Sequence, residues 1–262
     1  MADRTKRLFL VLWVLGIAGV LSFLMVDLEA LIGMMPLPED QKAEMPPWYV
    51  IKLASVAQPA ILVTLAVVIG VWLAPKVGLR APATEAFAER RTILPELRPL
   101  ILPGMVAGIL SGIAIVACWL LFRPFLDAEF VVRSEAFNKL IPAAVRFLYG
   151  GLTEEVLLRW GMMTFLVWLF WQLFGRGSER PAGGAFVGAI MVSALLFGAG
   201  HLPIASMLSG GLTVPLTLFV ITANSIFGIV AGFLYWRRGL ESAIIAHIFA
   251  HVVLLSAVYF AL

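Results

Sequence analysis

The sequence is poor in cysteine, in charge and in histidine. Cys118 is the only cysteine among 262 residues, so an intramolecular disulfide is excluded. Only 13% of the residues are charged, whereas a soluble domain has about a quarter. The net charge is +3, but the sequence has no long basic tract and no nucleic-acid motif, so no nucleic-acid partner is expected.

Apolar residues make up 61% of the chain, which is too many for the core of a soluble domain of this size. A helix needs about 20 mainly apolar residues to cross the hydrocarbon of a bilayer. Because backbone polar groups must be satisfied internally in lipid, such runs are expected to be helical. The sequence therefore predicts an all-α, polytopic transmembrane helix bundle in a lipid bilayer. Its seven predicted spans are 8–26, 50–74, 100–122, 141–174, 184–206, 212–236 and 242–261.

Two features bear on topology. The first run is long for the core of a signal peptide and no small-x-small cleavage site follows it, so an uncleaved first helix is expected. Lys and Arg outside the spans favour an N-terminus on the cytoplasmic side, with twelve in the inner segments against four in the outer ones. The inner ones are Arg4, Lys6, Arg7, Lys76, Arg80, Arg90, Arg91, Arg98, Arg176, Arg180, Arg237 and Arg238, and the outer ones are Lys42, Arg123, Arg133 and Lys139.

Glycines recur at four-residue spacing within three of the spans. These are Gly104, Gly108 and Gly112; Gly184 and Gly188; and Gly228 and Gly232. Small residues at this spacing allow helix backbones to approach closely, so we expect them at helix–helix contacts and assign them no chemistry.

Ionisable residues are rare inside a bilayer and usually face a cavity or a partner. The fourth span carries Glu154, Glu155 and Arg159. On an α-helix Glu155 and Arg159 share one face and can form a salt bridge, while Glu154 is rotated by about 100°. The pair alone could be a structural staple, but Glu154 is then free to act as a general base.

All three histidines of the chain also fall in or beside spans. His201 ends the fifth span, and His247 and His251 share a face of the seventh because they are four residues apart. A single intramembrane histidine is often a helix–helix hydrogen-bonding residue. One spare carboxylate and three histidines, spread over three helices, favour function.

Two chemistries suit this set of residues. In the first, Glu154 and a histidine activate a water molecule while other polar groups stabilise an oxyanion. In the second, the histidines and Glu154 bind a metal ion such as Zn²⁺ that activates the water, although the sequence has no His-Glu-x-x-His motif. Polar residues of the sixth span, such as Asn224, either line a cavity or bond to neighbouring helices.

Three short motifs occur in order on separate spans: Glu154-Glu155-x-x-x-Arg159, Phe197-x-x-x-His201 and a late motif that begins at His247. In this the chain resembles the CAAX-protease and bacteriocin-processing (CPBP) family of intramembrane glutamic endopeptidases. The resemblance covers roughly residues 137–260. It divides the chain into N-terminal transmembrane helices and loops, 1–136, and a catalytic helical core, 137–262.

The resemblance implies an intramembrane protease without a cofactor. Glu154 and His201 would activate water, His247 and its polar partner would stabilise the oxyanion, and Glu155, Arg159 and Phe197 would support the site. The family has Asn or Asp where this chain has His251. Histidine can also donate a hydrogen bond, so His251 keeps the oxyanion role in principle.

The substrate implied by the resemblance is a membrane-associated protein or peptide. The family processes prenylated C-terminal tails, bacteriocin-type leaders and C-terminal sorting tags, and the sequence does not choose among them. A short chain with compact loops suggests a prokaryotic member in the inner membrane, for which a prenylated substrate is less expected.

One difficulty concerns depth. At 1.5 Å per residue, His201 lies about 25 Å from the start of its predicted span, and His247 lies about 9 Å from the start of its own. For the two to meet, a span must begin later or a helix must be broken or tilted; Gly198, Gly200 and Pro203 favour a break.

Two alternatives remain open. The chain could be a transporter or a bacteriocin-immunity binder, since proton-coupled transport also uses intramembrane Glu and His. It could also be a metal-dependent variant of the protease.

Overall fold

The computed structural model describes residues 2–36, 44–175 and 177–260. Within these ranges the chain is helical and contains no strand, which confirms the all-α class. The helices are α1 (Ala2–Ser22), η1 (Phe23–Met25), α2 (Leu28–Gly33), α4 (Trp48–Val77), α5 (Pro82–Ala88), α6 (Leu94–Phe122), η2 (Arg123–Phe125), α7 (Ala128–Leu140), α8 (Ala143–Val145), η3 (Arg146–Glu154), η4 (Val156–Met163), α9 (Thr164–Phe174), α10 (Gly183–Gly200), α11 (Leu202–Ser209), α12 (Val214–Arg237) and α13 (Leu240–Tyr259).

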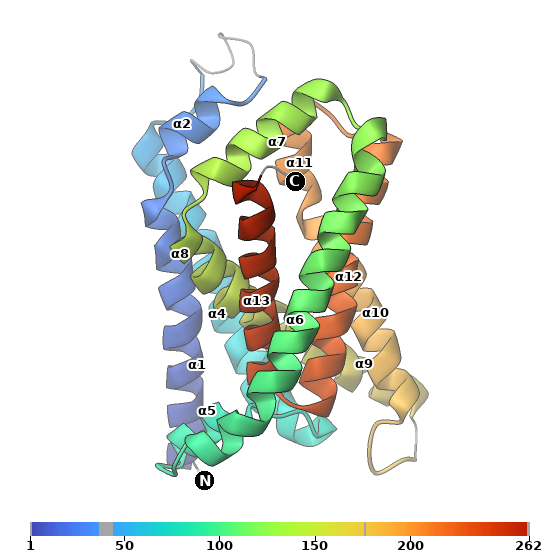
Figure 1. Ribbon diagram of the computed structural model, residues 1–262. Helices are drawn as coiled ribbons and strands as arrows, with labels where there is room; N and C mark the ends of the chain where they lie inside the picture. The colour runs from blue at the N-terminus through green and yellow to red at the C-terminus, as the bar shows by residue number, and fades with distance from the viewer. Residues whose placement is uncertain (1, 37–43, 176, 261–262) are drawn as a thin grey trace.

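Seven helical segments of the described residues are long and apolar enough to cross a membrane, which confirms a multi-pass membrane protein. They are Asp3–Met25, Trp48–Val77, Leu94–Phe125, Ala143–Phe174, Gly183–Ser209, Val214–Arg237 and Leu240–Tyr259. Several begin earlier than predicted, because the helices continue beyond the apolar run. In Figure 1, α1 begins and α13 ends at opposite ends of the bundle, as an odd number of spans requires. Lys42, Arg176 and the predicted end of the last span at residue 261 lie outside the described residues.

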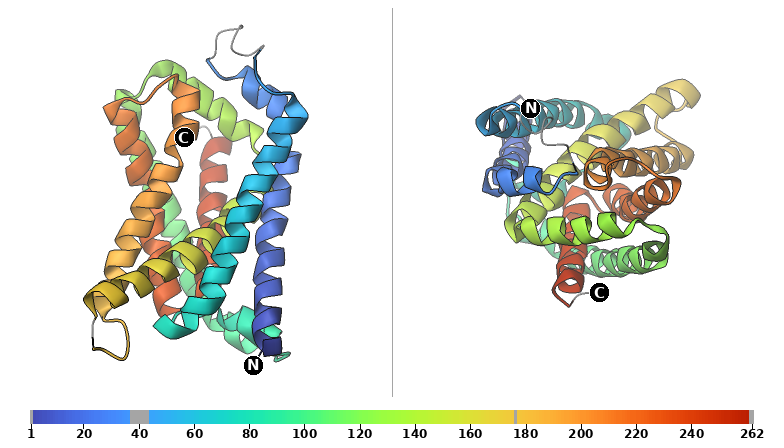
Figure 2. Two further views of the ribbon diagram at one scale, coloured as in Figure 1. Left: turned by 180° about the vertical axis from the view of Figure 1, so that it is seen from behind. Right: turned by 90° about the horizontal axis from the view of Figure 1, so that it is seen from above.

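The fourth span is strongly inclined. From α8 to α9 it crosses the bundle obliquely, which accommodates its 32 residues (Figures 1 and 2). It begins directly after Pro142, which separates it from α7. In the same figures α7 lies across one end of the bundle.

The middle of this span is π-helical rather than α-helical. The wide turns cover η3 and η4, and Glu155 lies between them. Their i→i+5 hydrogen bonds give more residues per turn than an α-helix, so the 3.6-residue spacing assumed from the sequence is wrong here. Stretches of π-helix are often found at functional sites.

The fifth span is interrupted at His201, as the sequence suggested. Helix α10 ends at Gly200, and α11 begins at Leu202 with Pro203 in its first turn. Proline has no N–H to donate to the preceding turn and is tolerated at the start of a helix, so the chain restarts there. The break follows His201 and therefore does not move this residue towards the other end of its span.

One hydrophobic core joins the two halves of the chain. Leu12 of α1 and Val63 of α4 are buried in the same cluster as Val156 and Trp160 of η4. Glycines let α4 and η4 come together: a Cβ at Gly161 would lie 2.8 Å from the Cα of Ala66. The helices of residues 1–136 therefore brace the span that carries the acidic motif.

Glycines of α6 bring α13 against its backbone. A Cβ at Gly108 would lie 2.8 Å from the Cα of Ala246, and one at Gly112 would lie 3.2 Å from the Cα of Ala250. Gly228 of α12 approaches Ala194 of α10 in the same way. The predicted close approach is thus present in these helices. For Gly184 the expectation is wrong, because no atom would lie within 4 Å of a Cβ there.

Substitution of Gly108 by alanine is expected to lower the free energy of unfolding by about 1–3 kcal/mol, the usual effect of overpacking. The new methyl group would meet the backbone of α13, which cannot move aside as a side chain can. Thermal unfolding in detergent micelles would measure the change, with Gly184→Ala as the matched control. Equal stabilities for the two variants would contradict the backbone contact.

Candidate active site

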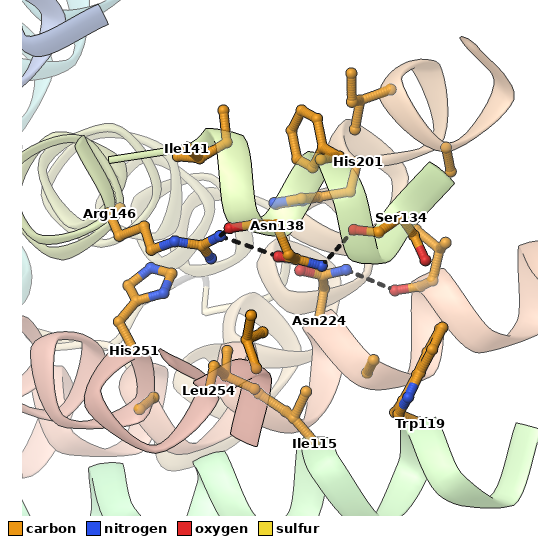
Figure 3. A pocket seen from close by; sticks show the side chains of 18 of the residues that line it. Ile115, Trp119, Ser134, Asn138, Ile141, Arg146, His201, Asn224, His251 and Leu254 are labelled. Atoms are coloured by element: carbon orange, nitrogen blue, oxygen red, sulfur yellow. Dashed lines mark hydrogen bonds between the residues drawn. The ribbon is translucent and has the colours of Figure 1, made fainter. Parts of the chain in front are cut away.

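A cavity of about 820 Å³ lies between the third, fourth, fifth, sixth and seventh spans, with α7 at one end. Its walls are mainly apolar, with a few polar side chains, a composition typical of ligand sites. All four residues predicted to be catalytic line it: Glu154, His201, His247 and His251. Figure 3 shows the region of the cavity around His201 and His251.

The acidic motif builds a charge network in the protein interior. Glu155 and Arg159 are fully buried, and Arg159 Nε lies 3.2 Å from Glu155 Oε2, so the predicted pairing is present despite the π-helical turns. The other carboxylate oxygen, Oε1, lies 2.9 Å from His247 Nδ1. Glu155 thus connects a cation on its own helix to a histidine on α13.

Glu154 lies on the other side of the same histidine. Its Oε2 is 3.8 Å from His247 Nε2, and its side chain keeps 18% exposure. A neutral His247 that donates from Nδ1 to Glu155 has Nε2 as an acceptor. The two carboxylates thus lie at the two nitrogens of one ring, with Nδ1 directed at buried Glu155 and Nε2 directed at Glu154 on the cavity wall.

His201 lines the cavity from the junction between α10 and α11. Its Nδ1 lies 2.9 Å from the carbonyl oxygen of Phe197, which acts as an acceptor and assigns the ring proton to Nδ1. Nε2 of the neutral ring is then a free base. Among the described residues no hydrogen bond or ion pair joins His201 to Glu154 or His247. His201, Glu154 and His247 nevertheless line the same cavity, although the predicted spans placed the two histidines at different depths.

Phe197 is the residue that contacts several of these groups. Its ring stands edge-on to His201 at 4.8 Å and to His247 at 6.1 Å, between ring centroids. Its face lies 5.5 Å from the guanidinium carbon of Arg159. Phe227 of α12, which the sequence did not point to, covers Arg159 at 5.7 Å and His247 at 4.1 Å. These rings shield the charges from lipid and offer cation–π contacts.

His251 stacks on His247, with ring centroids 4.9 Å apart and an interplanar angle of 11°. Its Nδ1 is buried without a hydrogen-bond partner among the described residues. Gly150 provides the room for this ring, because a Cβ there would lie 3.1 Å from His251 Cδ2. The late motif and the glycines before Glu154 are therefore in direct contact.

Sequence reasoning missed Asn138 and Arg146, which are among the polar residues that line the cavity. Asn224 was considered and left undecided, since a helical amide is as often a packing residue; here it lines the cavity while donating to Val220 O at 2.8 Å. Arg146 lies eight residues before Glu154, outside the motif, and only its place within a span could have drawn attention to it.

The residues present do not support the metal-dependent alternative. In the part of the chain that the structure describes, no group of three or more His, Cys, Asp or Glu side chains could hold a metal ion. His247 has both ring nitrogens directed at carboxylates, and Nδ1 of His201 bonds to the carbonyl oxygen of Phe197.

The fold and the cavity define a class: a multi-pass helical membrane protein with a buried glutamate–histidine site. Residues 136–253 match the family model described as Type II CAAX prenyl endopeptidase Rce1-like, which confirms the resemblance seen in the motifs. This is a family of proteases, which supports a peptidase, and together with the membrane helices it fits a membrane-associated substrate. No match was found among curated proteins or among solved structures.

Removing one member of the buried pair is expected to cost about 3–5 kcal/mol of stability, because it leaves the other charge uncompensated. Arg159→Met and Glu155→Gln should each show this loss in thermal unfolding. The double variant should lose less than the sum of the two, since neither charge then remains. Simple additivity in this double-mutant cycle would contradict a direct interaction.

Proposed function

We propose that this protein is an intramembrane endopeptidase that hydrolyses a peptide bond in a membrane-associated protein or peptide. The observation that carries the proposal is the position of Glu154. This partly exposed carboxylate lies beside His247 on the cavity, while its neighbour Glu155 is fully buried and paired with Arg159. One glutamate is thus available for chemistry and the other is committed to structure.

Glu154 is the proposed general base, with His201 as the second group that binds the attacking water. The carboxylate takes a proton from the water as its oxygen attacks the scissile carbonyl carbon. The same proton then passes to the amide nitrogen when the C–N bond breaks, so that the amine leaves neutral. Nε2 of His201, with Nδ1 fixed on the Phe197 carbonyl, accepts a hydrogen bond from the water.

His247 and His251 are the proposed oxyanion donors. In its protonated form His247 has one N–H on Glu155, and the other donates to the oxygen of the tetrahedral intermediate. His251 stacks on this ring and has an unpartnered ring nitrogen. Glu155 and Arg159 act through His247 by holding its orientation and balancing its charge.

Glu154→Gln is expected to reduce cleavage by about 10²–10⁴-fold, because an amide cannot accept the proton. Mass spectrometry of membrane-protein termini in source cells would compare this variant with the wild type. A terminus that disappears in Glu154→Gln identifies the substrate. Glu129→Gln, a change at an exposed site on α7, is the matched control and should leave all termini unchanged.

If both variants accumulate normally and no terminus changes, catalysis by Glu154 is wrong. Transport or toxin binding would then be measured directly, because a transporter needs Glu154 for flux and leaves its substrate intact.

His251→Asn is expected to keep cleavage within about tenfold of the wild type, because an amide supplies one hydrogen-bond donor at this place. His251→Leu has a similar size and no donor, and it should lose considerably more. The rates would be compared on the substrate found above. Equal rates for the two variants would remove His251 from the oxyanion role.

A further inference from the structure

Arg146, at the start of η3, is a cation inside the bundle with no acidic partner among the described residues. It lines the same cavity as Glu154. Its Nε is buried and has no hydrogen-bond partner among the described residues. A charge held away from water is costly unless it is paired, so an unpaired guanidinium on a cavity wall points to a ligand that supplies the missing charge.

The other arginines near this cavity each have a carboxylate. Arg123 bonds to Glu135 at 3.1 Å, Arg133 bonds to Glu129 at 2.6 Å, and Arg159 lies 3.2 Å from Glu155. Arg146 differs from them in that its described acceptors are neutral: the backbone oxygen of Asn138 at 2.6 Å and the Oδ1 of the same residue at 3.1 Å.

Asn138 holds the guanidinium in place. The Nδ2 group of Asn138 donates to Ser134 O at 2.9 Å, which fixes the amide on α7 and directs its Oδ1 towards Arg146 (Figure 3). Both contacts use Nη2 of the arginine, so Nε and Nη1 make no described hydrogen bond. The guanidinium is therefore positioned but retains donors that the protein does not use.

Neighbouring groups favour an anion at this place. His251 also lines the cavity and lies beside Arg146 in Figure 3. A carboxylate matches the unused donors of Arg146 well, because its two oxygens can accept from two N–H groups of one guanidinium. Most of the rest of the lining, including Ile141 and Leu254, is apolar and suits an apolar peptide around that charge.

We propose that Arg146 binds a carboxylate of the substrate peptide and so selects which peptides enter the site. The proposal rests on the proposed function, because the ligand is taken to be the peptide that Glu154 cleaves. The carboxylate belongs either to the C-terminus of the peptide or to an Asp or Glu side chain. Asn138 is a positioning residue in this arrangement.

The experiment uses the full chain carrying Glu154→Gln, so that bound peptides are not consumed. The protein sits in nanodiscs of phosphatidylcholine, which has no carboxylate. Three pools of apolar random-sequence peptides are offered: free acids, the same peptides amidated at the C-terminus, and amidated peptides that contain Asp or Glu. Captured peptides are quantified by mass spectrometry.

We expect more capture of peptides that carry a carboxylate than of peptides that carry none. Capture of the free acids tests the C-terminal carboxylate, and capture of the amidated peptides with Asp or Glu tests a side-chain carboxylate. Adding Arg146→Met should reduce this enrichment by about tenfold, the loss expected for one charge-assisted hydrogen bond. Arg146→Lys keeps a cation and should retain part of the enrichment. Arg133→Met, at the same end of the bundle but outside the cavity lining, should retain all of it.

Equal capture of acids and amides, or an equal loss of both in Arg146→Met, would overturn the proposal. A purely structural role for Arg146 predicts an equal loss of acids and amides, because it would lower total peptide capture without changing the ratio of captured acids to captured amides. Asn138→Ala removes the side-chain contact to Arg146, and it should lower the acid-to-amide ratio less than Arg146→Met does. If carboxylate selection depends on Arg146 but wild-type protein cleaves none of the captured peptides, the subsite stands and the peptidase proposal fails.

Discussion

The buried charge network of Glu155, Arg159 and His247 is the interaction on which the rest of the site depends. It ties the fourth span to α13 through a carboxylate with no exposed surface. Such a group is stable only when it is paired, so each member fixes the place of the others. Because Glu155 is committed in this way, the adjacent Glu154 differs from it in exposure although the two are neighbours in sequence. The different environments of Glu154 and Glu155 therefore follow from packing.

The surroundings of this network are built by close backbone contacts. Gly104, Gly108 and Gly112 set α13 directly against α6, and Gly150 and Gly151 set it against η3, so both faces of the helix that carries His247 and His251 are held at short range. Phe197 and Phe227 close the network from α10 and α12. Five spans thus define the position of a few polar atoms, while α1 and α4 pack against the inclined span.

The sequence predicted the class of fold, the seven spans and the Glu155–Arg159 pair, because hydrophobic length and i,i+4 spacing are local properties. It could not predict the π-helical turns, since their extra residue per turn is accommodated by packing against neighbouring helices and has no composition of its own. For the same reason Arg146 and Phe227 were missed: each reaches the site through the tilt of a helix, which a one-dimensional pattern does not contain. The depths of His201 and His247 looked incompatible from the predicted span lengths, yet both residues line one cavity.

The π-helical stretches before and after Glu155 have a consequence for how the chain can vary. A wide turn holds a surplus residue, so losing one residue there would convert it into an ordinary turn without separating the helix ends. The side chains beyond that point would rotate about the axis, and Glu154 would face another wall of the bundle. The turns that can absorb a change of length in this span are therefore the ones that carry Glu154. A deletion there would alter the direction of this side chain.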